Sequence, residues 1–180
     1  MHSFDEILVA YRRQVRLPWR PNAPPSARVW MLWHAPAMHL RITGRIGEFE
    51  TATRQAGHGW TSIDLGPHFG RWVAGNEMFE PLLSHPEELR GLLPEYEGAV
   101  AQTIAAELNR GSDQDVLAVQ GCGSLFGLAG VSRVLDRVVH AINGRLLMVF
   151  PGRHASGMYR LLDARNGWNY HAVPIPPDPL

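Results

Sequence analysis

Two short apolar runs, each followed closely by glycine, constrain the fold more than any other feature. Val116–Val119 and Leu146–Phe150 contain no polar side chain, which is typical of strands covered on both faces in a parallel sheet. Between them, residues 131–142 repeat apolar side chains with the period of one helical face. A right-handed βαβ unit follows, in which ligands bind beyond the carboxyl ends of the strands. The loop at residues 121–127 is therefore the first place to expect a ligand.

The rest of the chain continues the alternation of strands and helices. An apolar run predicts a strand at residues 29–33, a second strand is expected at 60–65, and helical periodicity predicts one long helix at 38–55. We expect a single α/β domain over residues 1–180, in three layers, with a mostly parallel sheet in Rossmann-like or P-loop-like order but without Walker motifs. Its further parts are an N-terminal helix (1–17), a helical insertion (66–110), a C-terminal hairpin and a Pro-rich tail (174–180). Within the insertion we expect a short helix at 69–74 and one or two longer helices from residue 86, broken or capped near Pro94.

The C-terminal hairpin is predicted from two β-prone segments. Residues 159–162 and 168–173 flank the turn at 163–167, where Asn166-Gly167 is a strong hairpin signal. The Pro-rich tail follows directly. Because proline lacks the N–H that a ladder needs, we expect the tail not to continue the sheet and to lie along the surface.

Composition limits the chemistry that the chain can support. The seventeen basic and seventeen acidic residues cancel, and every basic residue is arginine. The chain therefore has no overall field that would collect nucleic acid, no Schiff-base lysine and no P-loop lysine. The single cysteine fits a reducing compartment. No run approaches the roughly 20 apolar residues of a membrane span, and the charged residues 1–19 do not resemble a signal peptide. We expect a cytoplasmic protein without membrane contact.

The first helix begins at a capping box. Ser3 and Glu6 form the box, and Pro18 limits the helix to about residue 17. Acidic residues come first and arginines last, an order that complements the helix dipole on a solvated face. Contact with a partner or with nucleic acid is the alternative interpretation. The arginines concerned are Arg12, Arg13, Arg16 and Arg20.

The loop from Gly121 to Gly127 invites two interpretations. Closely spaced backbone N–H groups at Gly121, Gly123 and Ser124, ahead of a helix, suit an anion. The loop lacks the Gly-Lys-Ser/Thr of a P-loop, however, and has Phe126 where a dinucleotide fingerprint has its third glycine. A tight structural turn is the preferred interpretation, and nucleotide binding is the alternative.

Other reactive residues form no assembled motif. Cys122 follows a predicted strand, where α/β enzymes display nucleophiles, but the flanking pattern is not that of a nucleophile elbow and a buried apolar role is favoured. The nine histidines show no metal-binding spacing. His58 and Asp64 could meet near the mouth of the second strand. We expect no catalytic residue, no metal and no resident cofactor.

The chain resembles BrxB, the B component of BREX phage-exclusion systems, over nearly its whole length. The segments that carry the resemblance are Leu17–Arg20, Glu48–Glu50, Ala52–His58, Asp64–Leu65, Gly123–Gly127, Gly144–Leu147, Phe150–Gly152, Tyr159–Asp163 and Gly167–Tyr170. The resemblance implies a bacterial antiviral protein without an established catalytic activity. It also implies association with the PglZ-type phosphatase-like protein, in a set that includes a large ATPase and an adenine-specific DNA methyltransferase. The chain departs from the family at Cys122, where an aliphatic residue is expected, at the turn 153–157, and at His39 and Gly44.

Three functional hypotheses follow. The first is a non-catalytic adaptor that docks the PglZ-like protein and other BREX components. The second is a nucleotide- or DNA-responsive module, with a weak or indirect DNA contact through residues 12–20 or through the glycine loop. The third, a degenerate hydrolase using Cys122 or His58, is the least favoured, and the oligomeric state is left open. Aromatic residues expected to anchor a partner are Trp19, Trp72, Phe79, Trp168 and Tyr170.

Overall fold

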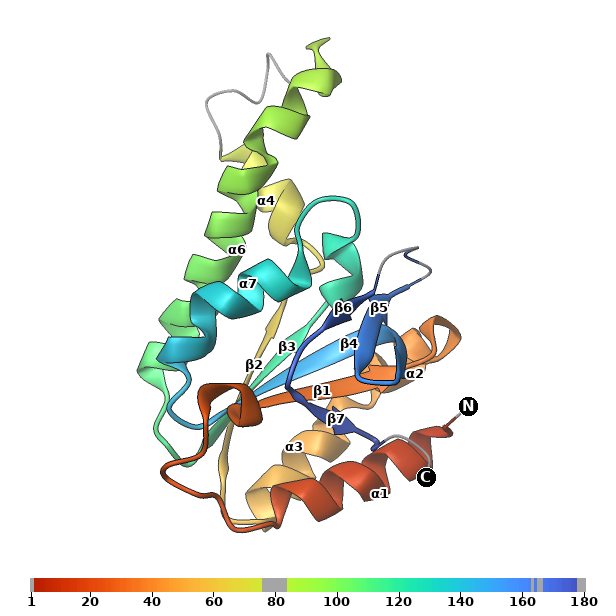
Figure 1. The fold of residues 1–180 in the computed structure, drawn as a ribbon, viewed down its shortest axis with the longest axis vertical. Helices are drawn as coiled ribbons and strands as arrows, with labels where there is room; N and C mark the ends of the chain where they lie inside the picture. Colours follow the sequence, from red (N-terminus) through yellow and green to blue (C-terminus); the bar gives the residue numbers. More distant parts are fainter. Residues whose placement is uncertain (1, 76–83, 163, 165–166, 178–180) are drawn as a thin grey trace.

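A seven-stranded, mostly parallel sheet forms the centre of the computed structural model, which describes residues 2–75, 84–162, 164 and 167–177 (Figure 1). The main path of the sheet runs β2-β3-β4-β1-β7, while β5 pairs with β4 and β6 pairs with β5. The fold class is therefore confirmed as three-layer α/β. The strands are β1 (Val29–His34), β2 (Gly59–Asp64), β3 (Asp115–Gln120), β4 (Arg145–Ala155), β5 (Met158–Leu161), β6 (Trp168–Asn169) and β7 (Val173–Ile175).

The two apolar runs of the sequence occupy the middle of this sheet. Residues 116–119 belong to β3 and residues 146–150 to β4, and all of them are buried. β4 pairs in parallel with both β3 and β1, so it is covered on both edges as well as on both faces. The order differs from the 3-2-1-4-5-6 arrangement of a Rossmann sheet, because β1 lies between β4 and β7.

Helices cover both faces of the sheet (Figure 1). Because successive strand residues point to opposite faces, Leu117 and Val119 join one buried cluster and Val116 and Ala118 join the other. Each fully buried large apolar side chain stabilises the fold by about 1.5–3 kcal/mol. One face carries α6 (Leu89–Arg110), which follows η3 (Pro86–Glu88), and α7 (Val131–Val138); the other carries α1 (Phe4–Val15), α2 (His39–Gly44) and α3 (Ile46–Gln55).

The N-terminal helix begins as predicted. The Ser3 hydroxyl accepts a hydrogen bond from the Glu6 N–H, and the Glu6 carboxylate accepts one from the Ser3 N–H at 2.6 Å. The helix ends at Val15, with Arg16 as its C-cap. Asp5 and Glu6 lie in its first turn and Arg12 in its last, so its charges complement the dipole.

Two predictions about helices are refined. Residues 38–55 do not form one helix, because the chain leaves helical geometry at Arg45 (φ −116°, ψ 21°) between α2 and α3. Pro94, in contrast, does not break α6, which is 22 residues long and continues past this proline. The short α4 (His68–Ala74) confirms the helix expected at 69–74, and it contacts α6, whose first turns project beyond the sheet (Figure 1).

The C-terminal region departs most from prediction. The Pro-rich tail does continue the sheet: β7 pairs in parallel with β1, and Pro174 stands opposite Met31. Proline is tolerated because β7 is the last strand of the order, where one side needs no partner. β4 also runs past the apolar segment to Ala155 and forms a hairpin with β5 that was not predicted. Residues 168–173 divide between β6 and β7, and Asn166 lies outside the described residues.

Candidate functional site

The glycine loop is a tight turn held against the end of β2. Gly121 adopts a φ of +73°, and an added Cβ would lie 2.4 Å from the Gly66 nitrogen, so this position requires glycine. The Ser124 hydroxyl lies 2.7 Å from the carbonyl oxygen of Gly121 and 3.0 Å from that of Leu65. The helix that follows, η4 (Cys122–Leu125), is a single 3-10 turn. These contacts favour the structural interpretation of the loop.

A hollow of about 410 Å³ lies where β1, β2 and β3 end, beside Pro151 of β4. We call it the carboxyl-edge hollow. Gly121, Gly123 and Ser124 line it, but Gly127 does not. Its charged lining residue is Asp64 rather than an arginine, which does not favour a nucleotide phosphate. The lining residues are Pro36, His39, Thr43, Asp64, Gly66, Gln120, Gly121, Gly123, Ser124, Pro151 and Leu162.

The residues considered for nucleophilic chemistry are placed unfavourably for it. Cys122 is fully buried, and burial raises the pKa of its thiol to about 12, so the thiol stays protonated. His58 precedes β2 and Asp64 ends it, which separates them by about 20 Å of extended chain. The prediction that His58 and Asp64 meet is therefore wrong. His58 instead stacks on Trp19, with ring centroids 3.7 Å apart.

The predicted aromatic anchors are all half-buried where the structure describes them. Trp72 packs against Tyr96 at 5.3 Å, and Trp168 packs against Phe150 at 6.1 Å, between ring centroids. Tyr170 contacts Trp168. These rings contribute to the core while keeping part of their surface accessible. Phe79 lies outside the described residues.

The N-terminal arginine cluster is divided by the fold. Arg20 and Trp19 line a hollow of about 270 Å³ at the amino ends of the strands, together with Arg28 and Arg145. Arg12 is exposed on α1, as is Arg16, and neither lines this hollow. Sequence reasoning missed Arg145, although a charged residue directly before a fully apolar run was a usable signal. Segments far apart in the sequence meet here, because His58 and Arg145 both lie over the Trp19 ring.

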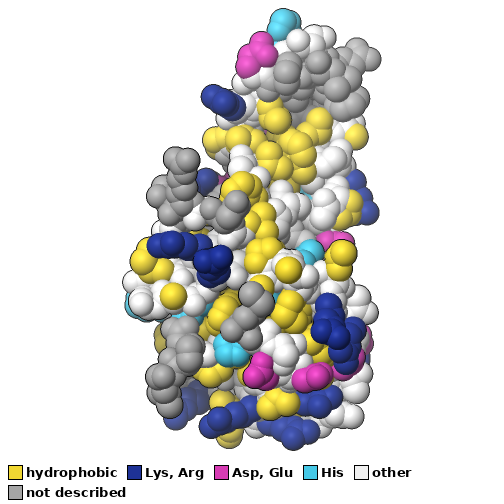
Figure 2. All heavy atoms as spheres, turned by 90° about the vertical axis from the view of Figure 1, so that its right-hand side faces the viewer, with side chains coloured by type: hydrophobic (Ala, Val, Ile, Leu, Met, Phe, Trp, Pro, Cys, Tyr) yellow, Lys and Arg dark blue, Asp and Glu magenta, His cyan; other side chains and the backbone are white. Residues whose placement is uncertain are grey.

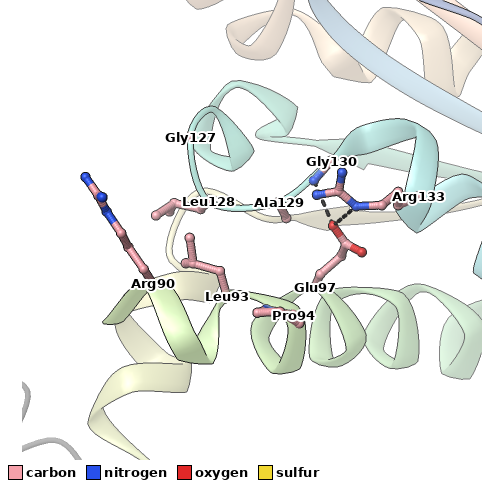
Figure 3. A pocket seen from close by; sticks show the side chains of 9 residues that line it. All are labelled: Arg90, Leu93, Pro94, Glu97, Gly127, Leu128, Ala129, Gly130 and Arg133. Atoms are coloured by element: carbon pink, nitrogen blue, oxygen red, sulfur yellow. Dashed lines mark hydrogen bonds and ion pairs between the residues drawn. The ribbon is translucent and has the colours of Figure 1, made fainter. Parts of the chain in front are cut away.

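A groove of about 490 Å³ lies between α6 and the loop that leads into α7 (Figure 3). We call it the α6–α7 groove. Figure 3 shows Leu93 and Leu128 facing one another in its middle, with Arg90 at one end and Arg133 at the other. Along α6, Arg90, Leu93 and Glu97 recur at helical spacing and share one face. The lining residues are Arg90, Leu93, Pro94, Glu97, Gly127, Leu128, Ala129, Gly130 and Arg133.

Glu97 connects the two sides of this groove, and hydrogen-bond donors around it balance the charge of its carboxylate. Its carboxylate is 5% exposed and accepts hydrogen bonds from the Gly130 N–H at 3.0 Å and from Nε of Arg133 at 2.8 Å, with a nitrogen of Arg137 at 3.8 Å. Arg90 has no carboxylate within 4.0 Å in the described part of the chain. The groove therefore presents net positive charge around an apolar middle.

Exposed apolar surface continues beside the groove. Phe126, which precedes Gly127, is 47% exposed. Hydrophobic side chains also gather over α4 and the first turns of α6, on the upper part of the face in Figure 2. The half-buried apolar residues of these two helices include Phe69, Trp72, Leu92 and Leu93.

Among the described residues, no group of three or more His, Cys, Asp or Glu is arranged to hold a metal ion, and no helix is long and apolar enough to cross a membrane.

Comparisons with protein-family models, with curated proteins and with solved structures find no match.

Proposed function

We propose that the chain is a non-catalytic adaptor of a BREX-type phage-defence complex and that it binds the PglZ-type phosphatase-like protein. The resemblance described above supports the choice of system and partner. The α6–α7 groove supports the mode of action, because it combines an apolar middle with arginines at both ends. Trp, Tyr and Arg side chains around such grooves commonly dominate binding energy.

The chemistry of the groove specifies the segment that it would take. Leu93 and Leu128 favour an apolar side chain between them, as seen in Figure 3. Among the described residues Arg90 has no carboxylate partner, whereas the carboxylate of Glu97 is already bound by the Gly130 N–H and by Arg133. The occupant is therefore a partner segment with an apolar residue flanked by acidic ones.

Co-expression with the PglZ-type protein tests the adaptor proposal. The two chains are expected to elute together from a sizing column, and Arg90→Glu is expected to weaken the complex at least roughly tenfold by reversing the charge at one end of the groove. Arg41→Glu is the matched control, because Arg41 is also exposed but lies on α2, on the opposite face of the sheet.

An apolar pair of variants tests the exposed apolar surface beside the groove independently. Phe126→Ser is expected to weaken the complex, whereas Leu40→Ser, at a position 84% exposed on α2, is expected to leave it unchanged. If the unmodified chains elute as two separate peaks at micromolar concentration, the adaptor proposal is refuted. If the complex forms but both members of each variant pair bind alike, the groove is not the docking surface.

A further inference from the structure

Arg145 carries a buried positive charge that the described part of the chain does not balance. The residue begins β4 and is 6% exposed. Its guanidinium donates to the carbonyl oxygen of Gly144 at 2.8 Å and lies 4.4 Å from the ring centroid of Trp19 and 5.9 Å from that of Trp30. No carboxylate oxygen of the described residues comes within 4.0 Å of it.

The known contacts of Arg145 do not offset this burial. Removing a guanidinium from water carries a large desolvation penalty, and cation–π contact with an aromatic ring recovers only a part of it. Burial, followed by the nearby positive charge of Arg28, lowers the pKa of Arg145. A charge held this way in a protein normally has a counter-ion.

Arg28 adds a second guanidinium at the same place. Its terminal nitrogens donate to the carbonyl oxygens of Ile142 and Pro21, both at 2.8 Å, which fixes the side chain. Its Nε is buried and has no hydrogen-bond partner in the described part of the chain. Two guanidinium groups are thus held near each other by backbone carbonyls rather than by carboxylates.

Both arginines line the hollow at the amino ends of the strands, which we call the amino-edge hollow. Asp113 is the acidic residue of its lining, and the nearby Asp115 is bonded to the Ser112 N–H at 2.6 Å. With three arginines against one aspartate, the lining has a formal net charge of +2. The lining residues are Trp19, Arg20, Pro21, Arg28, Gly111, Ser112, Asp113, Gln114, Asn143 and Arg145.

Trp19 determines what kind of ligand group fits. His58 lies 3.7 Å and the Arg145 guanidinium 4.4 Å from its ring centroid, so the ring faces are already covered. Trp19 Nε1 is buried without a hydrogen-bond partner in the described residues. The ring is therefore no stacking platform, and its Nε1 is a donor left unused within the described residues, which argues for an oxyanion and against a nucleobase.

We propose that the amino-edge hollow binds the phosphate group of a phosphate monoester. A phosphate monoester carries close to two negative charges at neutral pH, which matches the +2 of the lining better than a single carboxylate does. Arg145, Arg28 and Arg20 supply the cations, and Trp19 Nε1 supplies a further donor. The monoester can be a small metabolite or the terminal phosphate of a nucleic-acid strand, and neither source depends on the adaptor proposal.

Calorimetric titration of the full chain tests this site. Inorganic phosphate and a nucleoside 5′-monophosphate are expected to bind and to raise the melting temperature, relative to chloride at equal ionic strength. Arg20→Gln is expected to weaken binding roughly tenfold without affecting folding, because Arg20 is exposed. Arg12→Gln, an exposed arginine outside the hollow, is the matched control. Trp19→Phe keeps the stacked ring and removes the Nε1 donor, so it should also weaken binding.

Oligonucleotides with and without a 5′-phosphate distinguish the two sources. Tighter binding of the phosphorylated strand than of the monophosphate assigns the site to strand ends, and the reverse assigns it to a small ester. Equal binding of phosphorylated and unphosphorylated strands, together with no response to either small phosphate up to about 10 mM, overturns the proposal. Equal affinities in Arg20→Gln, Trp19→Phe and the Arg12→Gln control overturn it as well.

Discussion

Glu97 connects α6 to the loop before α7 through its bonds to the Gly130 N–H and Arg133. Glu97→Gln keeps the shape but removes the charge that these donors share, and it should lower the free energy of unfolding by about 1–3 kcal/mol. Urea denaturation at neutral pH measures the change. Glu95→Gln, an exposed position on the same helix, is the control and should change stability by less than about 0.5 kcal/mol. Equal effects in the two variants would show that Glu97 contributes nothing specific.

His34 should make the fold sensitive to acid. Burial, and to a lesser extent the neighbouring His39, lowers the pKa of His34 to about 4, against a hydrogen bond to Ala35 that raises it. The unfolded chain takes up a proton near pH 6.5 and the folded one does not, so stability is complete above about pH 6.5 and falls toward pH 4, by up to about 3 kcal/mol.

Unfolding free energies of the wild type and of His34→Asn, compared between pH 7.5 and 4.5, isolate this contribution. The variant should show a shallower acid dependence, because the remaining histidines, including His58 and His68 with their lowered pKa values, titrate in both proteins. Parallel pH profiles would assign the acid sensitivity to other groups.

The β3–η4 turn and the β4–β5 turn provide a matched test of how elements are joined. Gly121 and Gly157 have almost the same φ, +73° and +74°, but an added Cβ meets backbone at 2.4 Å at Gly121 and nothing within 4 Å at Gly157. Gly157→Ala should cost about 1–2 kcal/mol from left-handed strain alone. Gly121→Ala should cost more, because the end of β2 must also move. Thermal unfolding of both variants checks this order, and equal losses would contradict it.

Local sequence patterns correctly predicted the strands that are buried on both faces of the sheet. The apolar runs at residues 116–119 and 146–150 have no other plausible environment, and both strands are confirmed. Patterns failed where tertiary contacts decide. The tail was expected to leave the sheet from Pro174 onward because proline cannot donate, yet residues 173–175 pair with β1 as β7. The helix predicted at 38–55 is interrupted at Arg45, where the backbone leaves helical geometry. The spacing of apolar residues does not reveal such an interruption.

At the scale of the whole molecule, β7 closes the β1 edge of the sheet and buries Ile175, which is 1% exposed. Removing residues 173–180 uncovers β1 and should lower the free energy of unfolding by several kcal/mol, from about 1.5–3 kcal/mol for Ile175 plus the lost ladder bonds. Circular dichroism during heating measures the loss. Removing 178–180 alone is the control, and an equally small effect from both truncations would contradict the structural role of β7.

The candidate sites were only partly readable from the sequence, for a physical reason. Trp19 and Arg20 stood out by residue type, but their partner Arg145 lies 125 positions away, and only the parallel sheet brings the amino ends of distant strands together. Glu97 was not singled out from the sequence, because the loop that it binds is 33 residues away along the chain. The glycine loop was recognisable as a turn, while the charge of the hollow beside it depends on Asp64 of another strand.

Helix α6 separates the two proposed binding sites along its length. Its first turns line the α6–α7 groove up to Glu97, and Gly111 directly after its end lines the amino-edge hollow. At 1.5 Å per residue, about 20 Å of rigid helix separates Glu97 from Arg110. If both proposals hold, a protein segment in the groove would leave the amino-edge hollow open, so the two ligands would not exclude one another and the length of α6 would set the distance between them.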